Sequence, residues 1–361
     1  MTAPVTAPLA GLRVVDFSTL LPGPLATLLL AESGAEVVKI ERPGQGDEMR
    51  SYQPRLGTAS ANFALLNRGK LSVAADLKDP GRRDAVAELM RGADVVVEQF
   101  RPGVMDRLGL GYERISRDNP GVVYCSITGH GQHGPRADRA GHDLTYLAET
   151  GLLDLVRGAD GDPPLPPVLV ADIAGGAYPA LFNILLALAA RERTGRGSHL
   201  DVSMADNVRP LAYWALGQHR ATGEWPEPST GLVTGGSPRY RVYRTADGRH
   251  LAAAPLEERF WRRFCELIEL PERFRDDAAD PAATIAAVAE RVALRTAADW
   301  EARFAGQDVC CAVVATLAEA FPAGGTDALP LPLAPALRPA ASGRPYPALD
   351  EHAALLNGWP R

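Results

Sequence analysis

The sequence is poor in cysteine, has no block of like charge and has no long apolar run, and each of these shortages excludes a class of protein. Its four cysteines show neither the CxxC spacing of a metal site nor the density of a secreted disulfide scaffold. The 38 basic and 44 acidic residues are spread along the chain and leave a net charge of −6, which disfavours nucleic acid as a partner. No run of about 18 apolar residues and no basic leader with an apolar core occurs. We therefore expect a cytoplasmic protein with no metal site, membrane span or export signal.

The sequence also lacks the glycine patterns of nucleotide-binding folds. The turn after the first expected strand reads STLLPGPLA, so the GxGxxG pattern that lets a backbone approach a pyrophosphate is missing. Glu41 does end the second expected strand, where a ribose-binding acid would stand in a dinucleotide fold. The P-loop, HExxH and GxSxG motifs are missing too. These absences disfavour a nicotinamide oxidoreductase, the common hydrolases and the NTPases.

What the sequence does contain is an alternation of apolar strands with helices. Residues 12–18 and 35–41 have the composition of buried strands, and residues 23–34 between them that of a helix. Further strands are expected at 71–77, 94–100 and 199–204, and residues 121–131 are expected to form a strand that runs into a glycine-rich loop. Further helices are expected at 79–93 and 175–193. Such an alternation is typical of a parallel sheet covered by helices on both faces. We therefore predict an α/β fold for this part of the chain.

A smaller domain is expected after a segment rich in glycine, proline, serine and threonine. This segment, residues 220–240, is typical of a linker or an irregular loop, and we place the domain boundary in it. Beyond it, YRVYRTADGRHLAAAP predicts a hairpin that turns at Asp247 and Gly248, and three helical stretches follow. The smaller domain is therefore expected to be α+β. The proline-rich residues 328–347 are expected to be extended and to lead into a short helix.

Polar residues occur where the glycine-rich segments meet expected helices. AGHDLTYLAETG places His142 and Asp143 in a glycine-bounded loop, and Asp172 follows at the start of the long helix. A single histidine in such a place is more often structural than chemical. Asp172 could be an N-cap, or an acid/base group whose carboxylate is stabilised by the helix dipole while burial raises its pKa. The glycines that follow, Gly175 and Gly176, leave room for a ligand to approach.

Two arginines and two glutamates are further candidates. Arg42 and Arg101 each follow an expected strand, at the edge where open α/β sheets bind ligands. If their strands are neighbours, the two guanidinium groups could bind one polyphosphate, although each arginine alone is more often a solvated loop residue. Glu257 and Glu258 open an expected helix, where acids usually complement the helix dipole. The residues by themselves leave these alternatives open.

Seven segments, in order along most of the chain, carry a further signal. They are LAGLRVVDFSTLLPGPLATLLLAESGAEVVKIERPG, NRGKLSVAADLK, DVVVEQFRPGVMDRLGLGY, SITGHGQHGP, AGHDLTYLAETG, VADIAGGAYPAL and ADGRHLAAAPLEERFW. With these segments the chain resembles the family III CoA-transferase (CaiB/BaiF) superfamily. Within it the chain is most similar to the α-methylacyl-CoA racemases, because the transferases generally carry an aromatic residue where His142 stands.

The resemblance implies roles for the acidic and histidine candidates. His142 and Asp172 would be the two acid/base groups that face the α-carbon of an acyl-CoA. Asp143 and Glu257 would be their supporting acids, and Glu257 would orient His142. Each role is carried over from the family to the matching position of this chain.

The resemblance also implies how CoA is bound and how the chain folds. Arg42 and Arg101 are similar to family positions that contact the nucleotide and phosphates of CoA. The implied fold has a Rossmann-like large domain, residues 1–219 with 322–361, and a small domain at 220–321. Two subunits would form an interlocked homodimer that acts on acyl-CoA, with no membrane or nucleic acid partner. Neither a metal nor a redox cofactor would be needed.

The expected reaction is inversion at the α-carbon of a 2-methyl-branched acyl-CoA. Removal of a hydrogen α to a thioester needs a base on one face, an acid on the other, and donors for the enolate oxygen. Gly175 and Gly176 are our candidates for that oxyanion hole. The alternative is a CoA-transferase in which Asp172 attacks the thioester, forms a mixed anhydride and carries CoA as an aspartyl thioester. A non-catalytic acyl-CoA-binding protein is a third hypothesis.

Three departures from the family pattern concern the acyl group. Ala312 and Val313 stand where the racemases usually carry Thr-Pro, and Arg241 stands where an acidic residue is common. The connection into the proline-rich segment, which begins at Pro322, is shorter than the family leads us to expect. The resemblance therefore does not identify the acyl chain.

Overall fold

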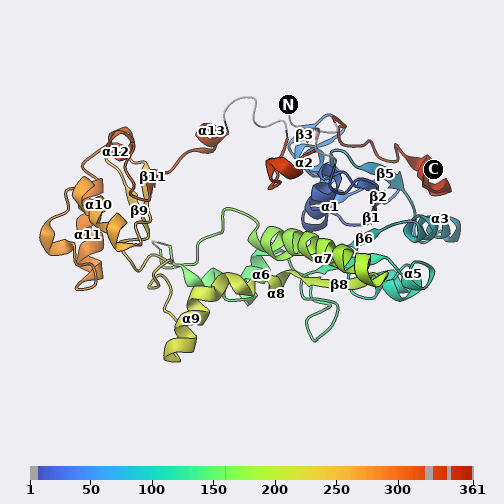
Figure 1. Cartoon of the computed structure of the whole chain (residues 1–361), viewed down its shortest axis with the longest axis horizontal. Helices are drawn as coiled ribbons and strands as arrows, with labels where there is room; N and C mark the ends of the chain where they lie inside the picture. The colour runs from blue at the N-terminus through green and yellow to red at the C-terminus, as the bar shows by residue number, and fades with distance from the viewer. Residues whose placement is uncertain (1–6, 159, 322–327, 340–342, 360–361) are drawn as a thin grey trace. The chain divides into compact units, whose positions relative to one another are not determined.

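A computed structural model describes residues 7–158, 160–321, 328–339 and 343–359 (Figure 1). The chain divides into two compact units, of which the first consists of Met1–Thr150, Pro166–Arg209 and Ala328–Arg361. The second consists of Gly151–Leu165 and Pro210–Asp327. The sequence placed boundaries at 219/220 and 321/322, whereas the structure divides the chain at 209/210 and 327/328 and also assigns Gly151–Leu165 to the second unit.

Six parallel strands form the centre of the first unit. Their order is β5-β2-β1-β6-β7-β8, which, counting only these strands along the chain, is the 3-2-1-4-5-6 order of the Rossmann fold. The chain reverses its course across the sheet between β1 and β6, and the carboxyl ends of the strands there form the edge at which such sheets bind ligands. The strands are β1 (Arg13–Asp16), β2 (Glu36–Glu41), β5 (Leu71–Ala74), β6 (Val95–Glu98), β7 (Val123–Thr128) and β8 (Ser198–Ser203).

Helices cover both faces of this sheet, because its strands carry apolar side chains on both sides (Figure 1). α3 (Pro80–Arg91) and α5 (Tyr112–Asp118) pack together and share a core with Val15, Val38 and Val96 of three adjacent strands. α1 (Pro22–Glu32) and α7 (Tyr178–Thr194) contact each other and the strands from the other side. The predicted α/β architecture with a parallel sheet is confirmed.

Shorter elements connect these layers. A 3-10 turn, η1 (Glu48–Ser51), precedes the hairpin of β3 (Arg55–Leu56) and β4 (Ala59–Ser60). The other elements of the first unit are α2 (Ala61–Asn67), α4 (Val104–Arg107), α6 (Asp143–Glu149), the π-helical turn η3 (Ala171–Ala177), α8 (Met204–Asn207) and the 3-10 turns η6 (Pro335–Leu337) and η7 (Ala353–Asn357).

The described C-terminal residues 343–359 return to the first unit and lie along its edge strand β5. The backbone N–H of His352 donates to the carbonyl of Ser72 at 2.9 Å, and the N–H of Ser72 donates to Nδ1 of His352 at 3.2 Å. Asp350 Oδ1 accepts the N–H of Ala74 at 2.8 Å. The short helix expected near this end is the 3-10 turn η7.

By length and composition, the helical run Ala171–Thr194 is the one helix among the described residues that could cross a membrane. In the structure this run contacts β7, β8 and α1 as one of the covering helices of the sheet.

The second unit contains a three-stranded antiparallel sheet, in the order β11-β10-β9, and a helical layer. β9 (Arg241–Arg244) and β10 (His250–Ala253) form the predicted hairpin, whose turn has Gly248 at φ +80°. The three predicted helical stretches are α10 (Glu258–Leu267), α11 (Pro281–Val292) and α12 (Ala297–Phe304). The remaining elements are η2 (Leu152–Leu155), η4 (Arg209–Ala212, which begins in the first unit), α9 (Tyr213–Thr222), η5 (Glu272–Phe274), β11 (Cys311–Val313) and α13 (Leu317–Ala320).

Two of the family departures lie in this small sheet. Ala312 and Val313 belong to β11, where they pair with Ala252 and Leu251 of β10. Arg241 is the exposed first residue of β9 and donates a hydrogen bond to the carbonyl of Gly235. The shortened connection begins within residues 322–327, which lie outside the described residues.

Candidate active site

His142 and Asp143 lie at the N-terminal end of α6, not in a loop as the glycines around them suggested. His142 is the N-cap: its backbone N–H donates to Thr145 Oγ1 at 2.9 Å, and its carbonyl accepts the N–H of Thr145 at 2.8 Å. These bonds fix the backbone at the first helical turn. They leave the exposed imidazole of His142 facing solvent and Asp143 buried beside it.

Asp172 lies in the π-helical turn Ala171–Ala177 that precedes α7, so the N-cap role considered from sequence is wrong. The N-cap of this turn is Val170, and Asp172 is its second residue. The wider register is visible where the N–H of Tyr178 donates to the carbonyl of Ile173, five residues back. π-Turns are rare and are found frequently at functional sites. Asp172 is half-buried in this turn.

The structure brings the three predicted residues together from two elements. The backbone N–H of Asp172 donates to Asp143 Oδ1 at 3.0 Å, which ties the π-turn to the start of α6. Burial and the nearby carboxylate of Asp143 raise the pKa of Asp172 to about 6, although His142 acts in the opposite direction. Asp172 can therefore exist in both protonation states near neutral pH, while His142 lies close enough to influence it.

Tyr146 forms part of the same site and was not singled out from sequence. It follows Asp143 by three residues on α6 and so lies on the same buried face. Its ring occupies the space that side chains at Gly129 and Gly141 would need: a Cβ there would lie 2.6 and 2.4 Å from ring atoms. Burial and the charges of Asp172, Glu149 and Asp143 raise the pKa of Tyr146 to about 12. Gly129 and Gly141 are therefore needed to leave room for the uncharged Tyr146 ring. The i, i+3 spacing from Asp143 is the sequence feature that could have indicated Tyr146.

A network of buried charges lies beneath the turn between β1 and α1. Lys39 Nζ lies 3.0 Å from Asp47 Oδ2, and Lys70 Nζ lies 3.3 Å from Asp16 Oδ2, with all four side chains fully buried. Asp47 Oδ1 also accepts the N–H of Leu20 at 3.2 Å, where the backbone has φ +62°. The network thereby holds the strand-helix turn at the ligand-binding edge. The sequence feature that could have indicated this network is Lys39, a lysine within the expected buried strand AEVVKIE.

Glu41 lies near Lys39 of this network, and its carboxylate is hydrogen-bonded to other side chains of the protein. Its carboxylate accepts hydrogen bonds from Arg50 Nε and Nη2, both at 2.7 Å, and from Ser72 Oγ at 2.6 Å. Burial opposes ionisation of Glu41, but Arg50 and Lys39 outweigh it and lower its pKa. The Glu41 carboxylate is therefore held by groups of the protein itself.

Arg42 and Arg101 lie where the sequence placed them, after β2 and β6, and both are exposed. β1 lies between their strands, so the expectation of neighbouring strand ends is wrong. Arg42 Nη1 donates to Gln45 Oε1 at 3.4 Å. Their roles in CoA binding stay predictions.

Glu257 belongs to the second unit, where it is the N-cap of α10. Its backbone carbonyl accepts the N–H groups of Phe260 and Trp261 at 3.0 and 2.9 Å, and its exposed side chain makes no capping hydrogen bond. Glu257 does not act as a side-chain cap, so its carboxylate is free for the supporting role predicted for it. Its predicted role in orienting His142 stays a prediction.

Comparison with known proteins identifies the family. The sequence model of CoA-transferase family III matches residues 9–329. The chain belongs to CoA-transferase family III. A solved structure from Brucella suis, described as a CAIB/BAIF family protein, is 31% identical, covers 97% of this chain and 98% of its own, and superposes with a TM-score of 0.84. The predicted resemblance is confirmed.

Relatives in family III include both a transferase and a racemase. Mouse succinyl-CoA:glutarate CoA-transferase is 38% identical over 74% of this chain and 61% of its own length, which is under two thirds of that enzyme. Mouse alpha-methylacyl-CoA racemase is 37% identical over 87% of this chain and 79% of its own. Relatives of both kinds match this chain, so membership of family III does not by itself select one of the two reactions.

Gly175 and Gly176, our oxyanion candidates in this family III site, have a packing reason to be glycine. A Cβ at Gly175 would lie 2.5 Å from the carbonyl oxygen of Met204, and one at Gly176 would lie 2.8 Å from Cβ of Pro22. Asn207 Nδ2 donates to the carbonyl of Gly175 at 3.0 Å. The glycines therefore let the π-turn pack closely on α8 and α1, while their oxyanion role stays a prediction.

Replacing Gly175 by alanine is expected to lower the free energy of unfolding by about 1–3 kcal/mol, because the backbone contact with Met204 forces the π-turn to shift. The shift moves Asp172, so catalytic activity should fall as well. Thermal unfolding and activity of the purified variant measure both effects. The control is Gly217→Ala in α9, where a Cβ meets no atom within 4 Å and the better helix former should leave the melting temperature equal or higher. Equal behaviour of the two variants would contradict the packing argument.

Proposed function

We propose that this family III enzyme is an acyl-CoA racemase or epimerase that inverts the α-carbon of a 2-methyl-branched acyl-CoA. The observation that carries the proposal is that the imidazole of His142 lies close to Asp172, a carboxyl group whose pKa is raised to about 6, and that the two residues come from separate elements. Inversion needs two such groups, because the proton must leave one face of the α-carbon and return to the other.

The chemistry proceeds through an enolate. In one direction, neutral His142 removes the α-hydrogen, the thioester oxygen gains charge, and protonated Asp172 delivers a proton to the opposite face. In the reverse direction the Asp172 carboxylate is the base and the His142 imidazolium is the acid. Because the pKa of Asp172 is raised to about 6, its protonated form is still populated at neutral pH. Asp143 keeps Asp172 in place through its hydrogen bond to the Asp172 N–H.

The α-hydrogen is acidified by the thioester itself, so we propose that the reaction needs neither a metal nor a redox cofactor. A preorganised donor to the enolate oxygen is typically worth about 2.7–4 kcal/mol of the barrier. We assign this task to backbone N–H groups near Gly175 and Gly176. The cytoplasmic location inferred from cysteine usage is part of the same proposal.

The alternative within family III is CoA transfer through Asp172. Asp172 is half-buried and could attack a thioester as a carboxylate, forming an anhydride and then an aspartyl-CoA thioester. This route uses Asp172 alone and gives His142 no chemical task. The proximity of His142 therefore favours racemisation.

Two assays on the purified enzyme separate these reactions. Incubation of a 2-methylacyl-CoA in D₂O should incorporate deuterium at the α-carbon and scramble its configuration, as followed by mass spectrometry and chiral chromatography. Addition of succinate or glutarate as an acceptor should yield no new CoA thioester. Acceptor-dependent CoA transfer without α-exchange would establish the transferase instead.

For the enantiomer from which the Asp172 carboxylate removes the α-hydrogen, the rate of exchange is expected to rise with pH through about 6. At higher pH a larger share of Asp172 is carboxylate, the form that removes the proton. Replacing Asp143 by asparagine removes the nearby like charge and keeps an acceptor for the Asp172 N–H, so the inflection should move to lower pH. Burial still acts on Asp172 in that variant, so the shift should be partial. A pH profile of exchange for both proteins measures this, and an inflection that moves upward would contradict it.

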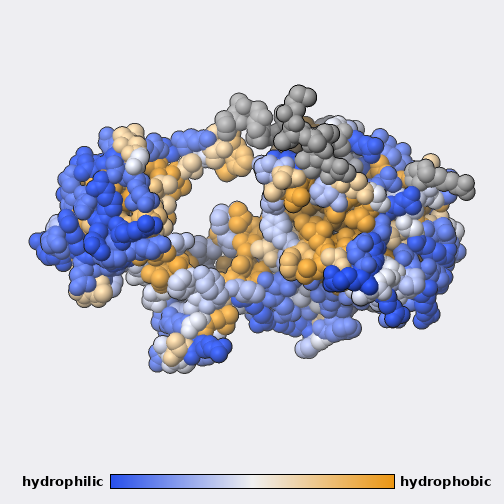
Figure 2. All heavy atoms as spheres, in the orientation of Figure 1, coloured by the Kyte–Doolittle hydropathy of each residue, from blue (hydrophilic) through white to orange (hydrophobic). Residues whose placement is uncertain are grey.

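We further propose that the enzyme is a homodimer, with the interlocked arrangement that the family resemblance implies. Support comes from four exposed apolar side chains on α7, Tyr178, Phe182, Leu185 and Leu186, which are 42, 62, 40 and 52% exposed. Their spacing of i, i+4, i+7 and i+8 places them on one stripe of the helix. Figure 2 shows apolar side chains gathered on the face over α7. An exposed stripe of this kind is typical of a protein–protein contact.

A further inference from the structure

Residues 345–352, which we call the strap, are bound to the first unit by contacts that the proposed reaction does not use. The hydroxyl of Tyr346 donates to the carbonyl of Leu56 at 2.7 Å, and its ring meets that of Phe63 edge to face, with 6.1 Å between the ring centroids. The turn η7 follows the strap and packs on α3, where Leu355 joins the core of the sheet. The strap is therefore anchored at both ends, within the first unit alone.

Between these anchors the strap meets the edge strand β5 at Ser72, where the side chain of His352 is a hydrogen-bond acceptor. The backbone N–H of Ser72 donates to Nδ1 of His352 at 3.2 Å, and Ser72 Oγ accepts the N–H of Asp350 at 3.1 Å. A ring nitrogen of histidine accepts a hydrogen bond only when it carries no proton. This contact therefore requires an uncharged imidazole at His352.

The strap also binds both partners of the buried Glu41 carboxylate. One partner is Ser72, whose Oγ donates to Glu41 Oε1 at 2.6 Å while it accepts from the strap. The other is Arg50, which donates to both oxygens of Glu41 and, through Nη1, to the carbonyl of Pro347 at 3.1 Å. Glu41 and Arg50 are 4 and 9% exposed. They form a clamp that the strap and β5 close from two sides.

The same clamp holds the turn that carries Arg42 at the ligand-binding edge of the sheet. Glu41 Oε2 accepts the N–H of Asp47 at 3.0 Å, and the N–H of Gly46 donates to the carbonyl of Arg42 at 2.9 Å. A Cβ at Gly46 would lie 2.8 Å from Glu41 Oε2 and 2.7 Å from Cδ of Arg50, so the turn packs directly on the clamp. The backbone position of Arg42 therefore depends on the clamp.

We propose that the strap positions the CoA-binding turn at Arg42 and that His352 is the positioning residue that makes CoA affinity depend on pH. Release of the strap opens the clamp, frees the turn and weakens binding of the CoA nucleotide. His352 itself touches neither substrate nor reacting atoms. The inference rests on the proposed function, since it assumes that the enzyme binds CoA and that Arg42 contacts its phosphates.

The direction of the pH effect follows from the groups around His352. Asp350 and Glu351 lie on its own segment, the clamp residues Glu41 and Arg50 lie beyond β5 and the strap backbone, and η7 meets α3 through apolar side chains. Burial opposes ionisation of Glu41, but its bonds to Arg50 lower its pKa, so it stays charged in mild acid. Protonation of His352 Nδ1 removes the acceptor for the β5 N–H, so CoA affinity should fall as the pH falls.

The test compares His352→Asn with His352→Ala in the full chain. Oδ1 of asparagine stands at the same distance along the side chain as Nδ1 of histidine and accepts a hydrogen bond without titrating, whereas alanine has no acceptor. Isothermal titration measures the Kd of CoA and of adenosine 3′,5′-bisphosphate, its nucleotide part, from about pH 8 to about pH 5, the range in which histidines change charge. The phosphates of each ligand titrate equally for all proteins, so ratios of Kd values are compared.

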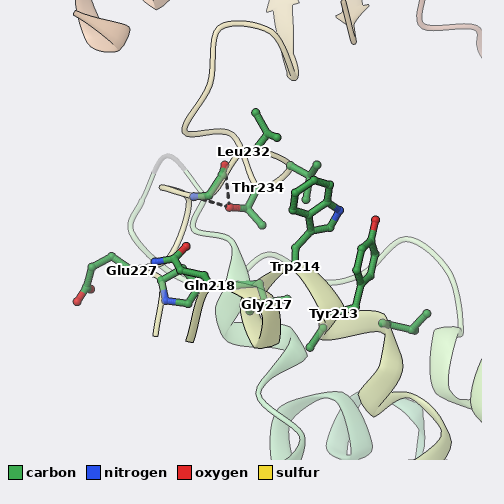
Figure 3. Close-up of a pocket in the computed structure, with 14 residues that line it drawn as sticks. Tyr213, Trp214, Gly217, Gln218, Glu227, Leu232 and Thr234 are labelled. Atoms are coloured by element: carbon green, nitrogen blue, oxygen red, sulfur yellow. Dashed lines mark hydrogen bonds between the residues drawn. The ribbon is translucent and has the colours of Figure 1, made fainter. Parts of the chain in front are cut away.

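The matched control is Thr234→Ala in the second unit. There Thr234 Oγ1 accepts the backbone N–H of Gly231 at 3.0 Å, so the variant loses the same kind of bond at a place that has no contact with the strap (Figure 3).

At about pH 8 we expect His352→Ala to bind both ligands about fivefold more weakly than wild type, because a smaller share of its molecules has the strap in place. His352→Asn should stay within about twofold of wild type. Between about pH 8 and pH 5 the wild-type Kd should rise about threefold more than that of His352→Asn. The KM of the thioester should follow these Kd values while kcat stays near that of wild type. Thr234→Ala should keep the wild-type Kd at every pH.

A His352→Ala variant that melts earlier than wild type but binds CoA with the wild-type Kd overturns the proposal, because His352 would then only stabilise the fold. Equal pH dependence of wild type and His352→Asn overturns it as well, and this comparison decides the matter if His352→Ala does not fold. CoA binding that depends on His352, without α-hydrogen exchange on a 2-methylacyl-CoA, supports the strap and overturns the racemase. Wild-type protein that binds no CoA at any pH overturns both.

Discussion

Replacing His142 by alanine is expected to slow α-hydrogen exchange on a 2-methylacyl-CoA by about 10²- to 10⁴-fold, the usual contribution of one positioned acid/base group. The imidazole lies on the exposed start of α6, and its backbone is held by Thr145, so its removal changes chemistry more than fold. His133, exposed in the same loop region, provides the matched control: His133→Ala should exchange at the wild-type rate. Retention of exchange in His142→Ala would contradict the two-base mechanism.

Asp172→Asn is expected to slow exchange by a similar factor. The melting temperature of the variant shows whether the loss of activity comes from the missing carboxyl group or from a damaged fold. The folded protein raises the pKa of Asp172, so the fold disfavours the ionised carboxylate above about pH 6. Asparagine removes that cost, and the variant should therefore melt at the same or a higher temperature at pH 7. An inactive variant that also melts earlier would indicate structural damage and would contradict this assignment.

Replacing Lys39 by methionine is expected to lower the free energy of unfolding by about 3–5 kcal/mol, because it leaves buried carboxylates without their cation. Lys39 and Asp47 are fully buried and 3.0 Å apart. Burial alone disfavours the ammonium, but the carboxylates of Asp47, Asp16 and Glu41 outweigh it and raise the pKa of Lys39. The pair also holds the turn at Leu20, so the loss should extend beyond the charges themselves.

Urea unfolding followed by circular dichroism measures this effect. The matched control is Lys78→Met, at an exposed position after β5, where a change within about 0.5 kcal/mol is expected. A Lys39→Met variant with the same urea midpoint as the control would show that the buried network contributes little. Because the chain has two compact units, the transition assigned to the first unit is the one that should move.

The regular layers of the fold were predictable because their residues interact locally or by simple periodicity. The strands and covering helices of the first unit, the hairpin at Gly248 and the three helices after it occur close to the expected residues. Predictions were poorer where tertiary contacts decide the backbone. The start of α6 at Asp143 depends on the turn closed by Thr145, and the glycines near it serve Tyr146 and not a flexible loop.

The candidate residues of the site were proposed from sequence, but their environment could not be predicted. His142, Asp143 and Asp172 came from the family resemblance and their position near the sheet edge, whereas the separation of the strands that precede Arg42 and Arg101 follows from strand order alone. The buried pairs around Lys39 and Lys70 connect residues distant in sequence, so only one charge within an apolar strand indicated them.

The sequence by itself determined the family and the α/β architecture, because both depend on residue types and their order, and it supplied the candidates for the reacting groups. The tertiary structure decided how Asp172 is presented. A π-turn packed on α8 brings the Asp172 N–H to Asp143, and burial beside that carboxylate raises its pKa to about 6. No periodicity in the sequence predicts this raised pKa. It depends on the contact between Asp143 and Asp172, which are 29 residues apart in the chain, and on their partial burial.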